Sequence, residues 1–556
     1  MKFAHSRFCC PLLALMSVVL IGGGFLAQDK QPRLTNVVEQ SGIDYEQVRG
    51  PYELYSMPAT LIGGCMLLDY DGDARLDAYL LQGNHLDFDR QDPTVTNRLY
   101  RNLDDWRFDD LTFQAGVGSY GYALGGVAAD VDNDGFVDLY VCNYGPNVLY
   151  MNNGDGTLRR VQDSALAGNE MSSTAAFGDL DSDGLLDLYV VNYVDWSLAT
   201  NKKCFENGVQ YHCPPNHFPP QPDMLFRNMD TLSFREVTQE AGADAERGTG
   251  LGIVIADFDM DGGPDIFVAN DINPNFLFRN QGAMKFSEEG LLSGAALDGA
   301  GNTMSNMGVA CGDYDNNGFL DLFVTHFTHE LDTLYANSGR MSFDDKTVVA
   351  GLSATRHGRM GWGTHFVDYD LDGWLDLIVA YGHIDREPQD RGAFRQRPGL
   401  FHNLGNGRFT EVGRQAGDYF EKAWVGRGLA VGDMDNDGDT DVLINHQEGC
   451  PSLLRNDTVA AGHWLRLELV GTQSNRSALN AKIVVRCGNN KRVFEVFGGG
   501  SFAASSDLRP LIGLGDNRIV DELVVRWPSG QVQRWESLPG DAAYRITELG
   551  DLRPVP

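Results

Sequence analysis

Oxygen-bearing side chains recur at a fixed spacing in this chain of 556 residues. A nine-residue motif carries Asp at positions 1, 3 and 9 and Asp or Asn at position 5, and it occurs seven times. Calcium takes about six to eight oxygen ligands in a flexible shell, and carboxylates at alternate positions of a tight loop converge on one point. We therefore expect each motif to bind Ca²⁺, so that the chain holds up to seven ions.

We name these motifs acidic loops 1 to 7 in chain order. The expected calcium ligands are Asp69, Asp71, Asp73 and Asp77; Asp130, Asp132, Asp134 and Asp138; Asp179, Asp181, Asp183 and Asp187; Asp257, Asp259, Asp261 and Asp265; Asp313, Asp315, Asn317 and Asp321; Asp368, Asp370, Asp372 and Asp376; and Asp433, Asp435, Asp437 and Asp441. Position 6 is glycine in six copies, which suits a left-handed turn. Loop 1 has Ala74 there, with Gly72 two positions earlier, so it departs furthest from the calcium motif. Asn317 lowers the charge of loop 5 and its expected affinity.

Two other structures use similar motifs. An EF-hand loop begins with this spacing but closes with an acidic residue at position 12. Here position 12 is apolar and continues into a β-rich run, which argues against a helix–loop–helix: the residues are Leu80, Val141, Val190, Val268, Val324, Val379 and Ile444. Asp-Gly clusters also form β-turns, but a turn requires one or two aspartates rather than four in register. The net charge of the chain favours metal binding over simple turns, because seven Ca²⁺ ions would bring the formal net charge of −33 to about −19.

Short apolar segments flank every acidic loop and predict a β-hairpin around it. A second signature, Leu-x-x-Asn, follows each hairpin, at residues 99–102, 149–152, 225–228, 277–280, 334–337, 400–403 and 453–456. A further short strand follows in most copies. Four short strands per repeat predict an all-β chain with a seven-bladed β-propeller. The last repeat lacks its fourth strand, so we expect residues 34–42 to complete the last blade and close the ring.

These repeats resemble FG-GAP/VCBS-type repeats, which form the calcium-loop propeller of integrin α-subunits, and the predicted propeller covers residues 33–457. After residue 462 the pattern changes to a smaller β-rich domain, residues 463–547. His463-Trp-Leu465, Gly513-Leu-Gly515 and Arg526-Trp-Pro-Ser-Gly530 make this segment resemble the ASPIC/UnbV domain. That domain follows such a propeller in the cartilage acidic protein family. Asn480-Ala481 departs from the Gly-Ala pair expected at that turn.

The N-terminus predicts export. Residues 1–27 combine basic residues with an apolar stretch, as a signal peptide does, and an uncleaved membrane anchor is the alternative. We therefore expect a secreted, periplasmic or cell-surface protein. The strong negative charge argues against nucleic acid and anionic membranes as partners.

The cysteines also indicate an oxidising compartment outside the cytoplasm. Cys204 and Cys213 flank a compact insertion, and we expect them to form a disulfide. A zinc site with His212 and His217 is the alternative, although the spacing matches no standard pattern. The remaining cysteines beyond the signal show no readable pairing: Cys65, Cys142, Cys311, Cys450 and Cys487.

A candidate ligand face lies opposite the acidic loops. The residue five positions after each motif ends the second strand, and all seven such residues can form hydrogen bonds: Gln82, Asn143, Asn192, Asn270, His326, Tyr381 and His446. Loops 83–97, 193–223 and 382–398 leave from that edge, and connections between blades bring basic and histidine side chains (Arg247, His357, Arg359 and Arg427). These residues either form a polar mouth for a ligand or cap turns.

We predict a non-enzymatic binding or adhesion protein that recognises a glycan or a protein on this face. The chain lacks Gly-x-Ser-x-Gly, His-Glu-x-x-His, phosphate-loop and dinucleotide-binding motifs, so no catalytic residue is assigned. His326 with His329, or His383 with Asp385, could still act as acid–base groups. A polysaccharide lyase or hydrolase and an assembly or maturation factor are therefore the alternatives.

Overall fold

The structure is a computed structural model that describes residues 31–51, 54–161, 165–230, 233–244, 248–353, 358–387, 392–488 and 490–555. Residues Gln31–Pro556 form one compact unit, and Met1–Lys30 form another. The expected export signal, residues 1–27, lies outside the described residues, as do Arg247 and His357. Among the described residues, no helix has the length and apolar character needed to cross a bilayer.

Seven antiparallel sheets of the same design follow one another along the chain. Their strands are β2 (Cys65–Leu68), β3 (Asp77–Leu80), β4 (Arg98–Asn102) and β5 (Phe108–Asp110); β6 (Tyr122–Ala129), β7 (Asp138–Tyr144), β8 (Val148–Asn152) and β9 (Leu158–Arg160); β10 (Ser172–Gly178), β11 (Asp187–Asn192), β14 (Met224–Asn228) and β15 (Phe234–Glu236); β16 (Gly250–Ala256), β17 (Asp265–Asn270), β18 (Phe276–Asn280) and β19 (Phe286–Glu288); β20 (Val309–Gly312), β21 (Asp321–Val324), β22 (Thr333–Asn337) and β23 (Phe343–Asp345); β24 (Gly361–Val367), β25 (Asp376–Tyr381), β26 (Gly399–Asn403) and β27 (Phe409–Glu411); and β28 (Gly426–Gly432), β29 (Asp441–His446), β30 (Ser452–Asn456) and β1 (Leu34–Asn36). The all-β prediction is confirmed, and each acidic loop joins the first strand of a sheet to the second.

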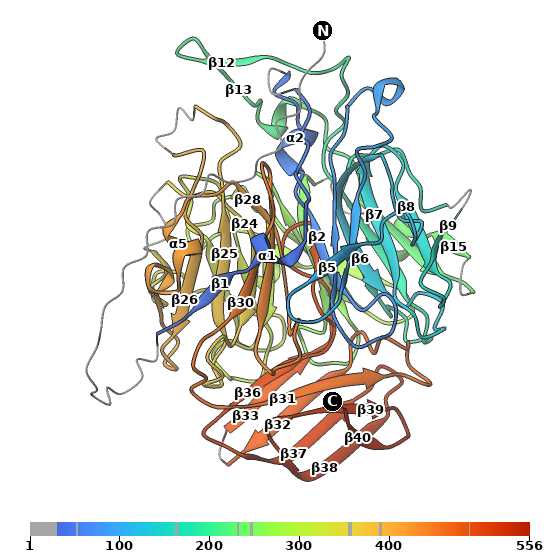
Figure 1. The fold of residues 1–556 in the computed structure, drawn as a ribbon, viewed down its shortest axis with the longest axis vertical. Coiled ribbons are helices and arrows are strands. Elements are labelled where there is room, and N and C mark those ends of the chain that lie inside the picture. Colours follow the sequence, from blue (N-terminus) through green and yellow to red (C-terminus); the bar gives the residue numbers. More distant parts are fainter. Residues whose placement is uncertain are drawn as a thin grey trace. The chain divides into compact units, whose positions relative to one another are not determined.

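The first strands of the sheets contact one another in a closed series, β2, β6, β10, β16, β20, β24, β28 and again β2. Glycine allows this close approach. A Cβ atom on Gly308 would lie 2.1 Å from the carbonyl oxygen of Trp362, and one on Gly125 would lie 2.3 Å from that of Ser173. A larger residue at either position would force neighbouring sheets apart. The sheets therefore surround a common centre, as the blades of a propeller do (Figure 1).

The N-terminal strand closes the ring. Strand β1 pairs antiparallel with β30, and Leu34 lies opposite Asn456 while Asn36 lies opposite Leu454. This confirms that a strand from the N-terminal segment completes the last sheet, although the strand ends at Asn36 and residues 38–41 of the predicted 34–42 form a helix. Closure removes the unpaired strand edge that would otherwise expose backbone hydrogen-bonding groups.

The connections between the strands contain short helices and one hairpin. The helices are α1 (Val38–Ser41), α2 (Pro58–Leu61), α3 (Thr238–Ala241), α4 (Gly290–Ser293) and α5 (Asp418–Glu421), with 3₁₀ turns η2 (Phe88–Arg90), η3 (Pro215–His217) and η5 (Gly413–Gln415). The hairpin of β12 (Cys204–Glu206) and β13 (Val209–Tyr211) extends from the long connection in the third sheet. Figure 1 shows β12, β13 and α2 at the same end of the sheets.

The C-terminal residues form two further sheets. One contains β36 (Leu511–Gly515), β31 (His463–Val470), β39 (Ala542–Thr547) and β40 (Leu552–Val555), and the other contains β33 (Asn490–Glu495), β32 (Lys482–Cys487), β37 (Ile519–Arg526) and β38 (Val532–Pro539). Strand β40 extends this region beyond the predicted end at residue 547. Leu467, Ile483 and Val525 belong to its buried core, which also includes Phe177 of β10.

One segment of the C-terminal region enters the ring of first strands. Strand β34 (Gly498–Gly499) pairs with β16, and β35 (Ala504–Ser505) pairs in parallel with β2. Between them, the Ser501 hydroxyl donates to the Leu429 carbonyl at 2.6 Å, and the Phe502 ring packs 4.7 Å from Trp362. The segment therefore fills the centre of the propeller, so the two regions share one core.

Candidate metal loops and a ligand cavity

Every acidic loop is held by its own carboxylates. In all seven loops the position 1 carboxylate accepts the N–H of position 6, and the position 9 carboxylate accepts the N–H of position 2. In loop 2, for example, Asp130 Oδ2 accepts from Gly135 at 2.8 Å, and Asp138 Oδ2 accepts from Val131 at 2.8 Å. These bonds fix the orientation of the carboxylates at positions 1 and 9.

The asparagine of the second signature links neighbouring loops, a role that its sequence pattern did not reveal. In sheet 2, the Asn152 N–H donates to Asp138 Oδ1 at 2.8 Å. Its side-chain amide donates to the Val137 carbonyl of its own loop and to the Tyr70 carbonyl of loop 1, at 3.1 and 2.7 Å. Asn102, Asn280, Asn337 and Asn403 form the same double link. These bonds fasten most loops to a neighbouring loop, while the side-chain amide of Asn228 in sheet 3 makes no such bond among the described residues.

The carboxylates converge as metal ligands do. In loops 1 to 4, carboxylate oxygens of three side chains lie within 4.8 Å of one another, and in loop 6 the group consists of Asp370, Asp376 and His402 of β26. Six loops also bury a carboxylate oxygen that has no hydrogen-bond partner, at position 1 or 3: Asp71, Asp132, Asp181, Asp313, Asp368, Asp433 and Asp435. A buried carboxylate without a partner is unfavourable unless a cation meets it. These residues therefore fit Ca²⁺, whose ligands are oxygens.

Burial raises the pKa values of the loop carboxyl groups. The pKa of Asp130 rises to about 6 and that of Asp138 to about 8, in both cases chiefly because burial disfavours the charged form. Loop 7 adds an acidic residue that the motif did not identify. Asp439, at position 7, has a buried oxygen without a partner, and burial raises its pKa to about 9. A bound cation would favour the ionised form of all these groups.

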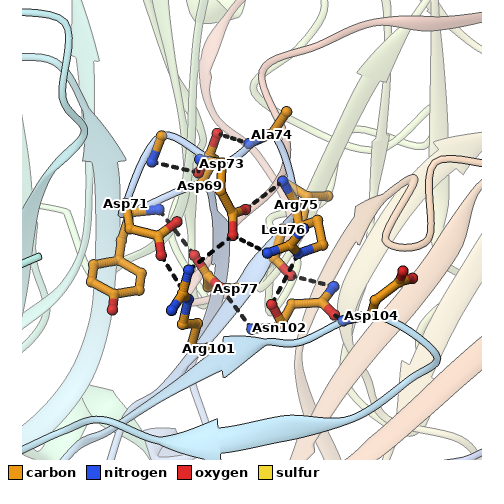
Figure 2. Close-up of polar contacts among 12 residues, drawn as sticks. Asp69, Asp71, Asp73, Ala74, Arg75, Leu76, Asp77, Arg101, Asn102 and Asp104 are labelled. Carbon is orange, nitrogen blue, oxygen red and sulfur yellow. Dashed lines mark hydrogen bonds and ion pairs between the residues drawn. The ribbon is translucent and has the colours of Figure 1, made fainter. Parts of the chain in front are cut away.

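Loop 1 keeps this conformation despite its altered sequence. Position 4 is left-handed in all seven loops, and Gly72 occupies it in loop 1 with φ of 76°. Ala74 at position 6 is also left-handed, with φ of 70°, where the other loops have glycine. Figure 2 shows the side chains of Asp71 and Asp73 directed at Arg101. Because Arg101 Nε lies 2.7 Å from Asp71 Oδ2, a cationic side chain already engages this loop.

Only some sheets carry an arginine directly before the signature asparagine, where sheet 1 has Arg101. Arg227 and Arg279, which precede the signature asparagine, pair with the carboxylates of loops 3 and 4, at 2.5 Å to Asp181 and 2.6 Å to Asp259. Sheets 2 and 5 have Met151 and Ala336 at this position. The acidic loops therefore differ in how much positive charge the protein itself supplies.

Basic residues of the C-terminal region contact position 1 of several loops. Arg466 lies 2.6 Å from Asp433 Oδ2, and Lys482 forms an ion pair with Asp257. Both pairs are largely buried. Loop 4 therefore forms ion pairs with both Lys482 and Arg279. The face that carries the acidic loops is therefore also the docking surface of the C-terminal region.

The seven residues predicted for the ligand face lie inside the protein. Gln82, Asn143, Asn192, Asn270, His326, Tyr381 and His446 are all buried. Most of them hold the connection that follows their strand: the Asn192 amide donates to the Pro222 carbonyl at 2.7 Å, and the Asn143 amide donates to the Pro146 carbonyl at 2.9 Å. Tyr381 and His326 instead contact other connections: Tyr381 donates to Asp332 at 2.7 Å, and His326 lies 2.8 Å from Asn306. The structure thus favours the turn-capping interpretation for these positions. Arg427 is likewise buried, over the ring of Trp362.

A cavity of about 310 Å³ lies at that end of the sheets. Its walls come from α2, the hairpin β12–β13, and the connections that follow β11, β17, β21 and β25. They include Tyr193, Asp271, Phe327, Trp362 and Met360. The sequence had no signal for this cavity, because its walls come from distant parts of the chain.

The predicted disulfide between Cys204 and Cys213 closes the hairpin wall. His212, the alternative zinc ligand, instead places Nδ1 2.6 Å from Asp385 Oδ1 and Nε2 3.2 Å from Arg49. Burial lowers the pKa of His212, so its ring is neutral, with Nδ1–H donating to Asp385. Because the cysteines are bonded to each other, the structure contradicts the zinc alternative.

Comparison with known proteins agrees with this architecture. A family model for FG-GAP-like repeats matches residues 130–190, 257–324 and 392–444, and a model for ASPIC and UnbV matches residues 471–552. Cartilage acidic protein 1 of Mus musculus is 26% identical over 314 residues, which cover 54% of this chain and 45% of that protein. The Homo sapiens protein is 25% identical over 311 residues, covering 54% and 44%. The matched region thus spans about half the length of these relatives.

Solved structures with a similar course of the chain have low identity. YCF48 bound to D1 peptide has a TM-score of 0.39 and 9% identity, covering 74% of this chain and 96% of that one. A streptogramin B lyase structure has a TM-score of 0.39 and 11% identity, covering 72% and 95%. The chain thus carries FG-GAP-like repeats and, after them, an ASPIC/UnbV domain.

Proposed function

We propose that this protein is an exported, calcium-binding and non-enzymatic binding module. The observation that carries this proposal is the buried carboxylate oxygens without a partner in six acidic loops. Bound Ca²⁺ would supply the positive charge that those oxygens need. The residues at positions 1, 3, 5 and 9 would hold the ion, and the position 9 carboxylate also accepts hydrogen bonds from position 2 and from the signature asparagine.

Calcium in this scheme stabilises the scaffold. The asparagine links join most loops to a neighbour, so an ion in a linked loop restrains more than one sheet. The C-terminal region rests on the same loops through Lys482 and Arg466. The end of the sheets away from the loops is left to recognise a ligand.

The ligand in this proposal is a glycan or a protein that reaches the cavity between α2 and the hairpin β12–β13. The connections that line it supply polar and aromatic groups together, as ligand sites commonly do. The Cys204–Cys213 disulfide supports an oxidising compartment outside the cytoplasm. The pairing of His212 with Asp385 and Arg49 favours a structural role for these groups over acid–base catalysis.

The calcium claim and the binding claim are tested separately. Metal analysis of the purified chain should find several calcium ions per molecule, and its thermal unfolding should shift upward between EGTA and millimolar Ca²⁺. Mg²⁺ serves as the control, because it demands a tighter octahedral shell. Equal unfolding temperatures in EGTA and Ca²⁺ would refute the calcium claim. A glycan array and a pull-down in Ca²⁺, run beside a reducing-sugar assay, test the binding claim. Turnover without stable binding would show an enzyme instead.

A further inference from the structure

The cavity beside the hairpin β12–β13 has an uneven distribution of charge. Three carboxylates line it, those of Glu206, Asp271 and Asp385, and its described lining contains neither lysine nor arginine. Asp385 is accompanied by His212, which in turn contacts Arg49. Asp271 has no ion pair in the described part of the chain. Glu206 has none either, but its side chain is exposed, so Asp271 is the less exposed of the two cavity carboxylates without an ion pair among the described residues.

Only neutral groups contact the Asp271 carboxylate. The Tyr193 hydroxyl donates to its Oδ2 atom at 2.6 Å, and the Ser305 hydroxyl lowers its pKa as a further hydrogen-bond partner. Ser305 also contacts a second acidic residue, because its N–H donates to Glu330 Oε2 at 2.8 Å. Burial raises the pKa of Asp271 to about 6 and that of Glu330 to about 7. A positive charge beside Asp271 would relieve both carboxylates.

The other walls suit an apolar group that carries such a charge. Met57, Met307 and Met360 supply flexible, polarisable surface, and Phe327 and Tyr193 supply aromatic rings near the acidic end. Methionine adapts to irregular apolar groups, and aromatic faces attract cations. Trp362 also lines the cavity, although Arg427 already lies 4.0 Å from its ring centre.

We propose that this cavity binds an ammonium group on a short apolar stem, with the charged nitrogen beside Asp271. This inference rests on the proposed ligand face and specifies the chemistry that the face recognises. The ammonium group belongs either to a small amine or to a lysine side chain of a protein partner. A neutral or acidic glycan lacks the group that Asp271 requires.

The test uses the full-length chain in millimolar Ca²⁺ at pH 7.5 and three probes of similar shape. These are 2-phenylethylammonium, the neutral 2-phenylethanol and the anionic 3-phenylpropionate, titrated by calorimetry. The ammonium probe should bind at least about tenfold more tightly than the other two, because only it can pair with the carboxylate. Nα-acetyl-lysinamide forms a fourth arm, and tighter binding of that probe would identify a protein side chain as the source.

Two variants locate the binding. Asp271→Asn keeps the size of the side chain and should reduce ammonium binding at least about tenfold while leaving the alcohol unaffected. Asp344→Asn, at an exposed position in β23, is the matched control and should bind like the parent chain. Equal binding of alcohol and amine would refute the selection for a cation but leave the cavity as a ligand site. Failure of every probe, in a chain that still captures a partner on this face, would refute the inference and leave the proposed function standing.

Discussion

Replacing Asp132 with asparagine should affect stability in opposite directions with and without calcium. Asp132 stands at position 3 of loop 2, where its buried Oδ1 has no partner. Sheet 2 carries Met151 where sheets 1, 3 and 4 place an arginine that pairs with their loops, so loop 2 lacks that source of positive charge. Burial and the neighbouring Asp134 charge both raise the pKa of Asp132.

The size of the expected change in the free energy of unfolding follows from the linkage between calcium binding and folding. An extracellular calcium site has a Kd on the order of 10⁻⁴ M, so about 2 mM Ca²⁺ stabilises the folded chain by about 1.8 kcal/mol per site. Asp132→Asn should remove most of that amount in calcium. In EGTA the sign reverses: a carboxyl group whose pKa is raised on folding destabilises the ionised folded state at pH 7.5. The neutral amide removes that penalty and should leave stability unchanged or raise it.

The assay is denaturant unfolding of the parent chain and the variant, in EGTA and in 2 mM Ca²⁺, together with metal analysis. Asp155→Asn is the matched control, because Asp155 lies exposed in the turn between β8 and β9 of the same sheet and bonds only to Thr157. The variant should lose one calcium ion, and the control none. Equal destabilisation of the variant in both buffers would refute the reasoning, since the loss would then come from the fold and not from the ion.

Three further predictions follow from the same contacts. Arg279→Met should raise the calcium affinity of loop 4 about several-fold in calorimetric titration, because the guanidinium competes for its carboxylates; unchanged affinity would contradict this. Lys482→Ala should lower the free energy of unfolding by about 3–5 kcal/mol, since it leaves the buried Asp257 without its partner. Lys346→Ala, at an exposed ion pair, should cost less than about 1 kcal/mol, and similar losses for both variants would argue against the docking contact. Ammonium binding to the cavity should strengthen as pH rises through about 6, where Asp271 ionises; a flat titration from pH 5 to 7.5 would exclude that carboxylate.

Local patterns were sufficient for much of the architecture. The spacing of four oxygen-bearing residues predicted loops between paired strands, because a nine-residue turn brings alternate side chains to one point whatever surrounds it. The lone strand at residues 34–42 could be assigned to the last sheet because one repeat lacked a strand. Cys204 and Cys213 could be paired because they flank one short insertion. Each inference depended on residues close in sequence or on the count of repeats.

The ligand face shows where such patterns fail. His326, Tyr381 and His446 follow a regular spacing, but that spacing only places them at the end of a strand. Whether such a side chain faces solvent depends on the connection that packs over it, and here the connections bury all three. A buried polar residue at a strand end forms hydrogen bonds with its own or a neighbouring connection, so the pattern identified turns rather than a binding surface.

The amino-acid sequence by itself determined the acidic loops, the strand repeat, the ring closure and the disulfide, because these depend on spacing along the chain. Tertiary structure decided which cations meet which loops, that residues 498–505 fill the centre of the ring, and that Asp271 lines a cavity without a basic partner. Those features join residues separated by tens to hundreds of positions. Their charges and surfaces meet only after the sheets have closed, which is why the loops could be predicted from the sequence and the cavity could not.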